Sequence, residues 1–390
     1  RSIMREKILF LQAPTGTGKT LATIFPAIQA MGQNMGDKIF YLTAKNATGV
    51  VAHDTFLLME EQGYEGKTVV ITAKDKMCLL EERSCNPDDC PYAKGHFDRV
   101  NDAVYDILQE ENMMDRDCIL RWAKERRVCP FEYSLDIASW VDHIICDYNY
   151  VFDPNVCLKR FFAEGIRGDY LFLVDEAHNL VERARDMYSE TLVKEDFLVM
   201  KKKLKIYGKK LENTLERCNK EMLALKRQCE RMLVLEEMDA FLFALFRAAA
   251  AMDELLQKEG NIVDRDEVLE FYFKIRNFVN LSDDFDEHYR IYCDYDEKGQ
   301  FCLHLFCVDP SYMLQKRLDR SRACVFFSAT LLPIQYYKEL LCSDDDVYAI
   351  YADSVFEQEK RALLIGRDVS SRYTRRTFAE YLAFTDYIEA

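Results

Sequence analysis

The sequence of 390 residues has no long apolar run, and glycine and proline are scarce, with 14 and 8 residues. No stretch approaches the roughly 18–20 apolar residues that a helix needs to cross a bilayer, so we expect no membrane-spanning helix and no membrane partner. A secretory signal is also missing. Because 49% of the residues are apolar, the chain is globular rather than disordered. Its length allows roughly two to four structural units.

An excess of positive charge is missing as well. Lysine and arginine number 52 against 67 aspartates and glutamates, which gives a formal net charge of −15. This balance excludes a protein that coats nucleic acid through a generally basic surface, although a local basic groove stays open. Any contact with nucleic acid must therefore come from a confined patch.

Residues 8–20 form the first stretch that carries chemistry. Ile8 to Leu11 predicts a short buried strand, and the apolar residues after Thr20 predict a helix. The spacing between them is that of a phosphate-binding loop, with Ala13 where the usual pattern has its first glycine. A plain glycine-rich turn is the alternative. Strand, Gly-Lys-Thr and apolar stretch together favour a site for a nucleoside triphosphate.

Each part of this loop has a role in binding phosphate. Its glycines let backbone N–H groups converge on an anion, and the start of the helix adds positive potential. Lys19 can reach the β- and γ-phosphates, and the Thr20 hydroxyl can bind Mg²⁺. The predicted nucleotide-binding residues are Ala13, Pro14, Thr15, Gly16, Thr17, Gly18, Lys19 and Thr20.

Strands and helices alternate after the loop. Residues 38–43 and 68–72 predict buried strands, and residues 44–59 predict a helix between them. Such alternation indicates crossover connections and a parallel sheet, which binds ligands beyond the carboxyl ends of its strands. Thr43 and Lys45 lie just past one such end.

A later strand ends in the second half of a hydrolytic site. Residues 143–147 and 169–174 both predict buried strands, and Asp175-Glu176-Ala177-His178 follows the second. Asp175 can hold the Mg²⁺ ion that the phosphates bind. Glu176 is placed to activate the attacking water as a general base, and His178 can sense the state of the γ-phosphate. Lys19, Asp175 and Glu176 are thus the predicted catalytic residues.

Residues 323–327 predict one more buried strand. Ser328 and Thr330 follow it, so two small hydroxyl residues stand at a strand tip beside the expected site. Alone this triplet carries little information, but after the phosphate loop and Asp-Glu-Ala-His it completes an ordered set. We expect Ser328, Thr330 and His178 to couple the nucleotide state to movement.

Cysteines cluster where the alternation stops, between residues 73 and 135. Cys78, Cys85 and Cys90 have the spacing C-x6-C-x4-C, and Cys129 follows much later. Such a set indicates a four-thiolate metal site. Zinc sites usually draw on C-x(2–4)-C pairs and the chain has no C-x2-C, whereas an iron–sulfur cluster tolerates wider spacing. From spacing alone a cluster, a zinc ion and free buried thiols all stay open.

The remaining cysteines have simpler interpretations. Cys118 lies in an apolar helical context, and nine others, such as Cys146, are most simply small buried apolar residues. Fourteen cysteines beside a phosphate-binding loop fit a reducing cytoplasm, or the nucleoid of a bacterium, better than a disulfide scaffold.

A proline-free stretch over residues 186–285 has apolar residues at intervals of three and four and predicts an inserted helical domain. Residues 287–307 predict a β-hairpin around Asp296 to Gly299. Two basic segments, 121–127 and 201–210, can contact a phosphate backbone, but solvated helix faces explain them at least as well.

These segments together resemble the superfamily 2 iron–sulfur DNA helicases of the XPD/DinG type. The segments are residues 13–20, Tyr-Leu-Thr-Ala-Lys (41–45), the four-cysteine insert, Asp-Glu-Ala-His (175–178) and Ser-Ala-Thr (328–330), in the family's order. Residues 128–134, 147–154 and 308–311 are also similar to family segments. The resemblance spans nearly the whole chain.

The resemblance implies an α/β fold, with a RecA-like P-loop motor domain made of residues 1–72, 136–185 and 308–345. It implies a 4Fe–4S cluster on Cys78, Cys85, Cys90 and Cys129 within a domain of residues 73–135. Residues 186–307 would be the helical Arch domain, and residues 346–390 the start of a second motor domain. ATP and Mg²⁺ are the other implied cofactors.

The implied activity is ATP-driven 5′→3′ movement on single-stranded DNA and unwinding of forked DNA in repair by a monomer. A DNA-binding ATPase switch, or the motor of a nuclease, is the alternative. The chain departs from the family pattern in lacking the glutamine segment before the loop, a basic residue within Asn46 to Gly49 and most of the second motor domain. We therefore expect a piece of a longer helicase that binds ATP–Mg²⁺ and hydrolyses it weakly by itself.

Overall fold

The structure is a computed structural model that describes residues 1–389 except 45, 84, 164, 259–261 and 361–364. The chain divides into two compact units, Arg1–Ala352 and Asp353–Ala390. No helix in the described part is long and apolar enough to cross a membrane.

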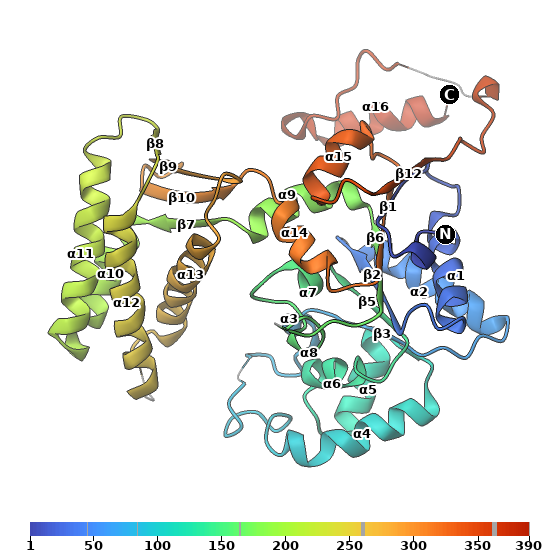
Figure 1. Ribbon diagram of the computed structural model, residues 1–390, viewed down its shortest axis with the longest axis horizontal. Helices are drawn as coiled ribbons and strands as arrows, with labels where there is room; N and C mark the ends of the chain where they lie inside the picture. The colour runs from blue at the N-terminus through green and yellow to red at the C-terminus, as the bar shows by residue number, and fades with distance from the viewer. Residues whose placement is uncertain (45, 84, 164, 259–261, 361–364, 390) are drawn as a thin grey trace. The chain divides into compact units, whose positions relative to one another are not determined.

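The first unit is built on an eight-stranded sheet in which every strand pair is parallel (Figure 1). This confirms the predicted α/β fold. In spatial order its strands are β12 (Tyr348–Tyr351), β1 (Leu9–Gln12), β11 (Ala323–Ser328), β6 (Tyr170–Asp175), β2 (Lys38–Thr43), β5 (His143–Asp147), β3 (Thr68–Val70) and β4 (Met113–Met114).

Side chains of the central strands pack against helices on both faces of this sheet. All six residues of β2 are buried, with Ile39 and Tyr41 in one hydrophobic cluster and Phe40 and Leu42 in the other. This explains why the buried parallel strands are continuous apolar runs. Helices α1 (Lys19–Gly32) and α2 (Asn46–Glu61) lie on one side (Figure 1). The other side carries α7 (Asn149–Phe152), α8 (Lys159–Phe162), α9 (Leu180–Met187), α14 (Ser311–Leu318) and α15 (Ile334–Leu341).

The cysteine-containing insert is helical and is joined to the sheet. Its helices are α3 (Lys74–Met77), α4 (His96–Glu110), α5 (Arg116–Arg126) and α6 (Pro130–Ile137). Asp115 caps α5 by accepting a hydrogen bond from the Cys118 N–H group at 2.9 Å. Strand β4 of the insert pairs with β3, so the insert adds the edge strand of the main sheet.

The second insert combines helices with its own antiparallel sheet, ordered β7-β10-β9-β8. The predicted hairpin is confirmed, and the Asp296 carboxylate accepts hydrogen bonds from the N–H groups of Lys298 and Gln300 in its turn. The elements are β7 (Glu190–Val193), α10 (Lys194–Leu204), α11 (Lys209–Lys226), β8 (Leu233–Leu235), α12 (Asp239–Lys258), α13 (Arg265–Asp283), β9 (Tyr289–Tyr295) and β10 (Phe301–Cys307).

Two sequence-based boundaries need correction. Within the stretch 186–285 that was expected to be helical, α11 ends at Lys226, and Leu233–Leu235 instead pairs with β9 as a strand. The second motor domain was expected from residue 346, but β12 pairs with β1 in the first sheet, and the first unit continues to Ala352. Short strands at sheet edges bury little apolar surface, so their sequences carry weak patterns.

The second unit contains helix α16 (Phe378–Glu389) among its described residues. Residues 361–364, within the stretch expected to begin the second motor domain, lie outside the described residues. Among the residues that the structure describes, short 3₁₀ helices are Ile3–Arg5, Ala177–Asn179, Lys205–Tyr207, Gln358–Lys360 and Tyr373–Arg375.

Phe40 offers a test of the central packing. Its ring is fully buried and makes edge or tilted contacts with four aromatic rings at centroid distances of 5.1–5.8 Å. We expect Phe40→Ala to lower the free energy of unfolding by about 3–5 kcal/mol, measured by urea denaturation. Phe25→Ala, on the exposed side of α1, is the control with a far smaller loss. Equal losses in both variants would contradict this packing.

Candidate nucleotide site and thiol cavity

The phosphate-binding loop joins β1 to α1 and has the backbone that its glycines allow. Gly16 and Gly18 adopt positive φ angles of 82° and 72°, and Gly18 immediately precedes the helix. The Thr17 hydroxyl donates to the Pro14 carbonyl at 2.8 Å, and Lys19 Nζ donates to the same oxygen at 3.2 Å. Backbone donors and a lysine thus converge at a helix N-terminus, which suits an anionic phosphate.

Five of the predicted site residues lie together at the carboxyl ends of β6 and β11: Asp175, Glu176, His178, Ser328 and Thr330. The Ser328 hydroxyl donates to Glu176 Oε2 at 2.8 Å, and His178 Nδ1 lies 2.8 Å from the same hydroxyl. Because that hydroxyl has one proton, it accepts from His178 Nδ1. It also accepts from the Thr330 N–H group at 3.2 Å.

The loop and these residues meet because β11 lies between β1 and β6. The Ala13 N–H group donates to the Ser328 carbonyl at 3.1 Å, and Gln12 Nε2 donates to the Ala329 carbonyl at 3.2 Å. The structure therefore brings the predicted nucleotide, catalytic and coupling residues to one edge of the sheet. Their individual roles stay predictions.

Asp175 is buried and held from two sides. Burial raises the pKa of its carboxyl group, while hydrogen bonds from Tyr41 and from the Glu176 N–H group act in the opposite direction. Tyr41 donates to Oδ2 at 2.7 Å, and the Glu176 N–H group donates to Oδ1 at 2.8 Å. A carboxylate fixed in this way is a suitable ligand for a hydrated Mg²⁺ ion.

Glu176 has a left-handed backbone, with φ of 47° and ψ of 44°. This conformation is uncommon for a residue with a side chain and is found at sites where the surrounding structure enforces it. Here the Tyr148 hydroxyl donates to the Glu176 carbonyl at 3.0 Å, and Asn179 Nδ2 donates to the same oxygen at 3.2 Å.

Sequence reasoning missed the roles of Tyr41 and Tyr148. The Tyr41 hydroxyl interacts with Thr20 as well as Asp175, so it links the two predicted Mg²⁺ ligands. Tyr148 donates to the Asp175 carbonyl in addition to that of Glu176. Both rings are buried and look like core residues in sequence. For Tyr41 the one available signal was a tyrosine between two apolar strand neighbours, whereas Tyr148 lies between Asp147 and Asn149 and gave no such signal.

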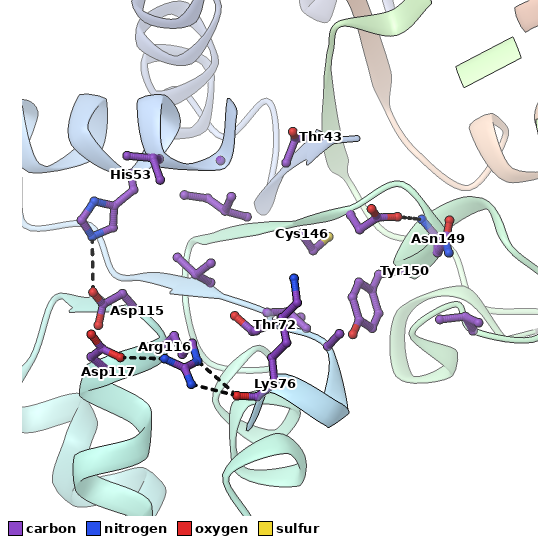
Figure 2. A pocket seen from close by; sticks show the side chains of 18 of the residues that line it. Thr43, His53, Thr72, Lys76, Asp115, Arg116, Asp117, Cys146, Asn149 and Tyr150 are labelled. Carbon is purple, nitrogen blue, oxygen red and sulfur yellow. Dashed lines mark hydrogen bonds and ion pairs between the residues drawn. The ribbon is translucent and has the colours of Figure 1, made fainter. Parts of the chain in front are cut away.

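A cavity of about 730 Å³, separate from the predicted nucleotide site, lies beyond the ends of β2, β3 and β5 (Figure 2). His53 Nε2 faces Asp115 Oδ2 across it at 4.0 Å, and Arg116 donates to the Lys76 carbonyl. Thr43 lines this cavity as expected of a strand-end residue. Lys45 lies outside the described residues.

The four predicted cluster cysteines line a single cavity of about 320 Å³: Cys78, Cys85, Cys90 and Cys129. They come from the end of α3, the following loop and the start of α6. The Cys129 N–H group donates to Nδ1 of buried His96 at 3.2 Å, which ties α6 to the start of α4. The nine cysteines predicted to be small core residues are all buried, as expected.

The two basic segments are engaged within the protein. Trp122 Nε1 donates to Glu111 at 3.0 Å, and Arg126 lies over the Trp122 ring. In the helical insert, Lys201 pairs with Glu216 at 2.7 Å, and other acidic residues neutralise Lys203 and Lys210. These contacts favour solvated or internally paired helix faces over a phosphate-binding surface.

The fold is that of a RecA-like P-loop domain, with the predicted site residues at one edge of its sheet. The family model DEAD/DEAH box helicase matches residues 1–79, and the model DEAD_2 matches residues 64–197. These matches confirm the predicted resemblance to the XPD-like superfamily 2 helicases.

Curated relatives share limited sequence identity with this chain. The rice regulator of telomere elongation helicase 1 homolog is 26% identical over 147 residues, which is 35% of this chain and 14% of that protein. The yeast transcription and DNA repair factor IIH subunit XPD/RAD3 is 25% identical over 140 residues, 34% of this chain and 17% of that protein. The chain spans between 9% and 30% of the length of such curated relatives.

Solved structures support the fold. The structure titled XPD_Helicase has a TM-score of 0.56 at 18% identity, with 99% of this chain and 67% of that chain covered. Truncated XPD has a TM-score of 0.55 at 16% identity, with 90% and 97% covered. At these sequence identities the structural similarity shows a shared fold and nothing more.

Tyr41 provides a test of the site geometry. We expect Tyr41→Phe to weaken the Mg²⁺-dependent part of ATP binding by about tenfold or more, because partners that orient metal ligands have effects of this size. The measurement is fluorescent ATP-analogue binding against Mg²⁺ concentration, with and without chelator. Tyr148→Phe is the control, since its hydroxyl contacts backbone carbonyls rather than the Asp175 carboxylate. Equal Mg²⁺ dependence in Tyr41→Phe and the wild type would contradict the assignment.

Proposed function

We propose that this chain forms the ATP-hydrolysing part of a helicase that moves 5′→3′ on single-stranded DNA and unwinds forked DNA, in repair. The observation that carries the proposal is the shared Ser328 hydroxyl, which contacts both Glu176 and His178. It connects the residues placed for hydrolysis to the tip of β11, so a change at the γ-phosphate has a direct path into neighbouring backbone.

In this proposal Lys19 and the loop N–H groups bind the phosphates, and Thr20 and Asp175 hold Mg²⁺. Glu176 takes a proton from the attacking water. Its contact with Ser328 then weakens as the carboxylate becomes protonated, and His178 and Thr330 rearrange with the serine. The similarity to XPD-like helicases supports single-stranded DNA as the polymer along which the protein moves.

The thiol cavity fits an iron–sulfur cluster. Four thiols are a donor set for clusters, and a cluster needs its ligands farther apart than a single zinc ion does. Among the described residues, the group of potential ligands that lie within 4.8 Å of one another is Asp294, Cys302 and His304. The four cysteines are not in that group. When bound, a cluster would supply a rigid cross-link between the loop of the insert and α6. Cys78, Cys85, Cys90 and Cys129 would hold it.

Variants of Lys19 and Glu176 distinguish ATP binding from ATP hydrolysis. We expect Lys19→Ala to weaken ATP binding roughly 10–100-fold, because a charge-assisted contact with phosphate is lost. Glu176→Gln should retain binding and lower the hydrolysis rate by about 10²–10⁴-fold, because the general base is lost. Binding is measured by fluorescence and hydrolysis by phosphate release, with and without single-stranded DNA.

Strand displacement by the full-length protein distinguishes a helicase from a switch. A fork with a 5′ single-stranded arm should be unwound by the wild type and not by Lys19→Ala. DNA-stimulated hydrolysis without any unwinding would instead indicate a DNA-binding ATPase switch. Unwinding from a 3′ arm alone would overturn the proposed direction.

Cys85 tests the cluster assignment. We expect anaerobically purified wild-type protein to be brown and to contain iron and acid-labile sulfide, and Cys85→Ser to lose the colour and most of both. Cys118→Ser is the matched control, because Cys118 lies in the same insert outside the cavity. Zinc without iron in the anaerobic wild-type protein would contradict the cluster.

A further inference from the structure

The β9–β10 hairpin of the helical insert (Figure 1) carries three side chains of types that can bind a metal ion. Cys302 and His304 are two residues apart on β10, so they share one face of the sheet. Asp294 on β9 pairs directly with Cys302. The intervening Leu303 is fully buried and belongs to the main core cluster, so the three polar side chains occupy the opposite face.

The three side chains are close enough to bind one ion. Their ligand atoms all lie within 4.8 Å of one another, and His304 Nε2 is 2.7 Å from Asp294 Oδ1. Tetrahedral zinc holds nitrogen, oxygen and sulfur ligands at about 2.0–2.3 Å, which places those atoms roughly 3–4 Å apart. Small side-chain rotations suffice to reach this geometry, and the strands need not move.

Neighbouring residues fix the orientation of the His304 ring. Its Nδ1 lies 2.8 Å from the Thr191 hydroxyl on β7, and Tyr292 stacks on the ring with centroids 4.4 Å apart and an interplanar angle of 12°. Both contacts point Nε2 toward Asp294. Metal-binding histidines commonly have such a partner on the second ring nitrogen.

The surroundings allow an ion to enter while they shield the sulfur. Cys302 is 3% exposed, whereas the side chains of His304 and Asp294 are 18% and 34% exposed. One sulfur, one nitrogen and one oxygen ligand suit zinc or a similar transition ion. Magnesium and calcium prefer oxygen ligands.

We propose that Asp294, Cys302 and His304 form a zinc site whose fourth position is open to water. The ion would join β9 to β10 and, through Thr191, support the contact with β7. The site is independent of the nucleotide loop and of the four-cysteine cavity, and it does not rest on the proposed helicase function.

Cobalt substitution tests this site in the whole chain. Protein is purified anaerobically, treated with a mild chelator that leaves iron content unchanged, and titrated with Co²⁺. We expect one Co²⁺ per chain, with a thiolate charge-transfer band and the visible bands of tetrahedral cobalt, and displacement by Zn²⁺. Both bands should be lost in His304→Ala and in the conservative Asp294→Asn. Thr191→Val should weaken affinity about tenfold.

Two matched variants decide where the metal binds. Cys307→Ser, on the same strand as Cys302 but facing the core cluster, should bind cobalt as the wild type does, and so should Cys118→Ser, which lies outside the thiol cavity. Cobalt bands that persist in folded His304→Ala or Asp294→Asn would overturn the proposal. So would a wild-type chain that binds no cobalt. Circular dichroism confirms that each variant is folded.

Discussion

Parallel pairing of β1, β11 and β6 is the constraint on which the site depends. Gln12 pairs with Ser328, and Phe327 pairs with Asp175, so residues from three distant parts of the chain end at the same edge. In an antiparallel arrangement alternate strands would end at opposite edges, and the loop would lie far from Glu176. The buried apolar side chains that hold these strands in register therefore also set the geometry for phosphate chemistry.

Both inserts leave the sheet at this same edge. The four-cysteine insert follows β3, and the helical insert begins soon after β6. Neither interrupts a strand, so each can add a structure of its own without disturbing the core. The first insert returns β4 to the sheet, and the second has a separate sheet with β10 and β9 as its inner strands. Each insert thus adds a structure of its own while the strand order of the main sheet is unchanged.

The sequence predicts the central strands well because parallel strands buried on both faces are continuous apolar runs. The range of β2 is predicted without error, and β5 likewise. The apolar runs of short edge strands such as β8 and β12 are only three and four residues long, and runs this short do not distinguish a strand from part of a helix or from the start of a new domain. Whether such a short segment forms a strand depends on the strand it pairs with, and the local sequence gives no information about that partner.

The candidate site was predictable where a local motif carries the chemistry and unpredictable where the contact is long-range. The loop and Asp175 to His178 follow from spacing and strand ends. The hydrogen bond from Tyr41 to Asp175 joins residues 134 positions apart, and nothing local marks it. Likewise the hairpin was expected, but Asp294 faces Cys302 only because the turn from Asp296 to Gly299 sets that register.

The left-handed backbone at Glu176 places stability and chemistry in opposition. A residue with a β-carbon costs roughly 1–2 kcal/mol there, and glycine would relieve that cost. Glycine would also remove the carboxylate that Ser328 contacts. The chain therefore keeps an energetically unfavourable residue at the centre of the site, and a search for more stable variants would select against it. Loss of activity that accompanies a gain in stability is the signature to expect at this position.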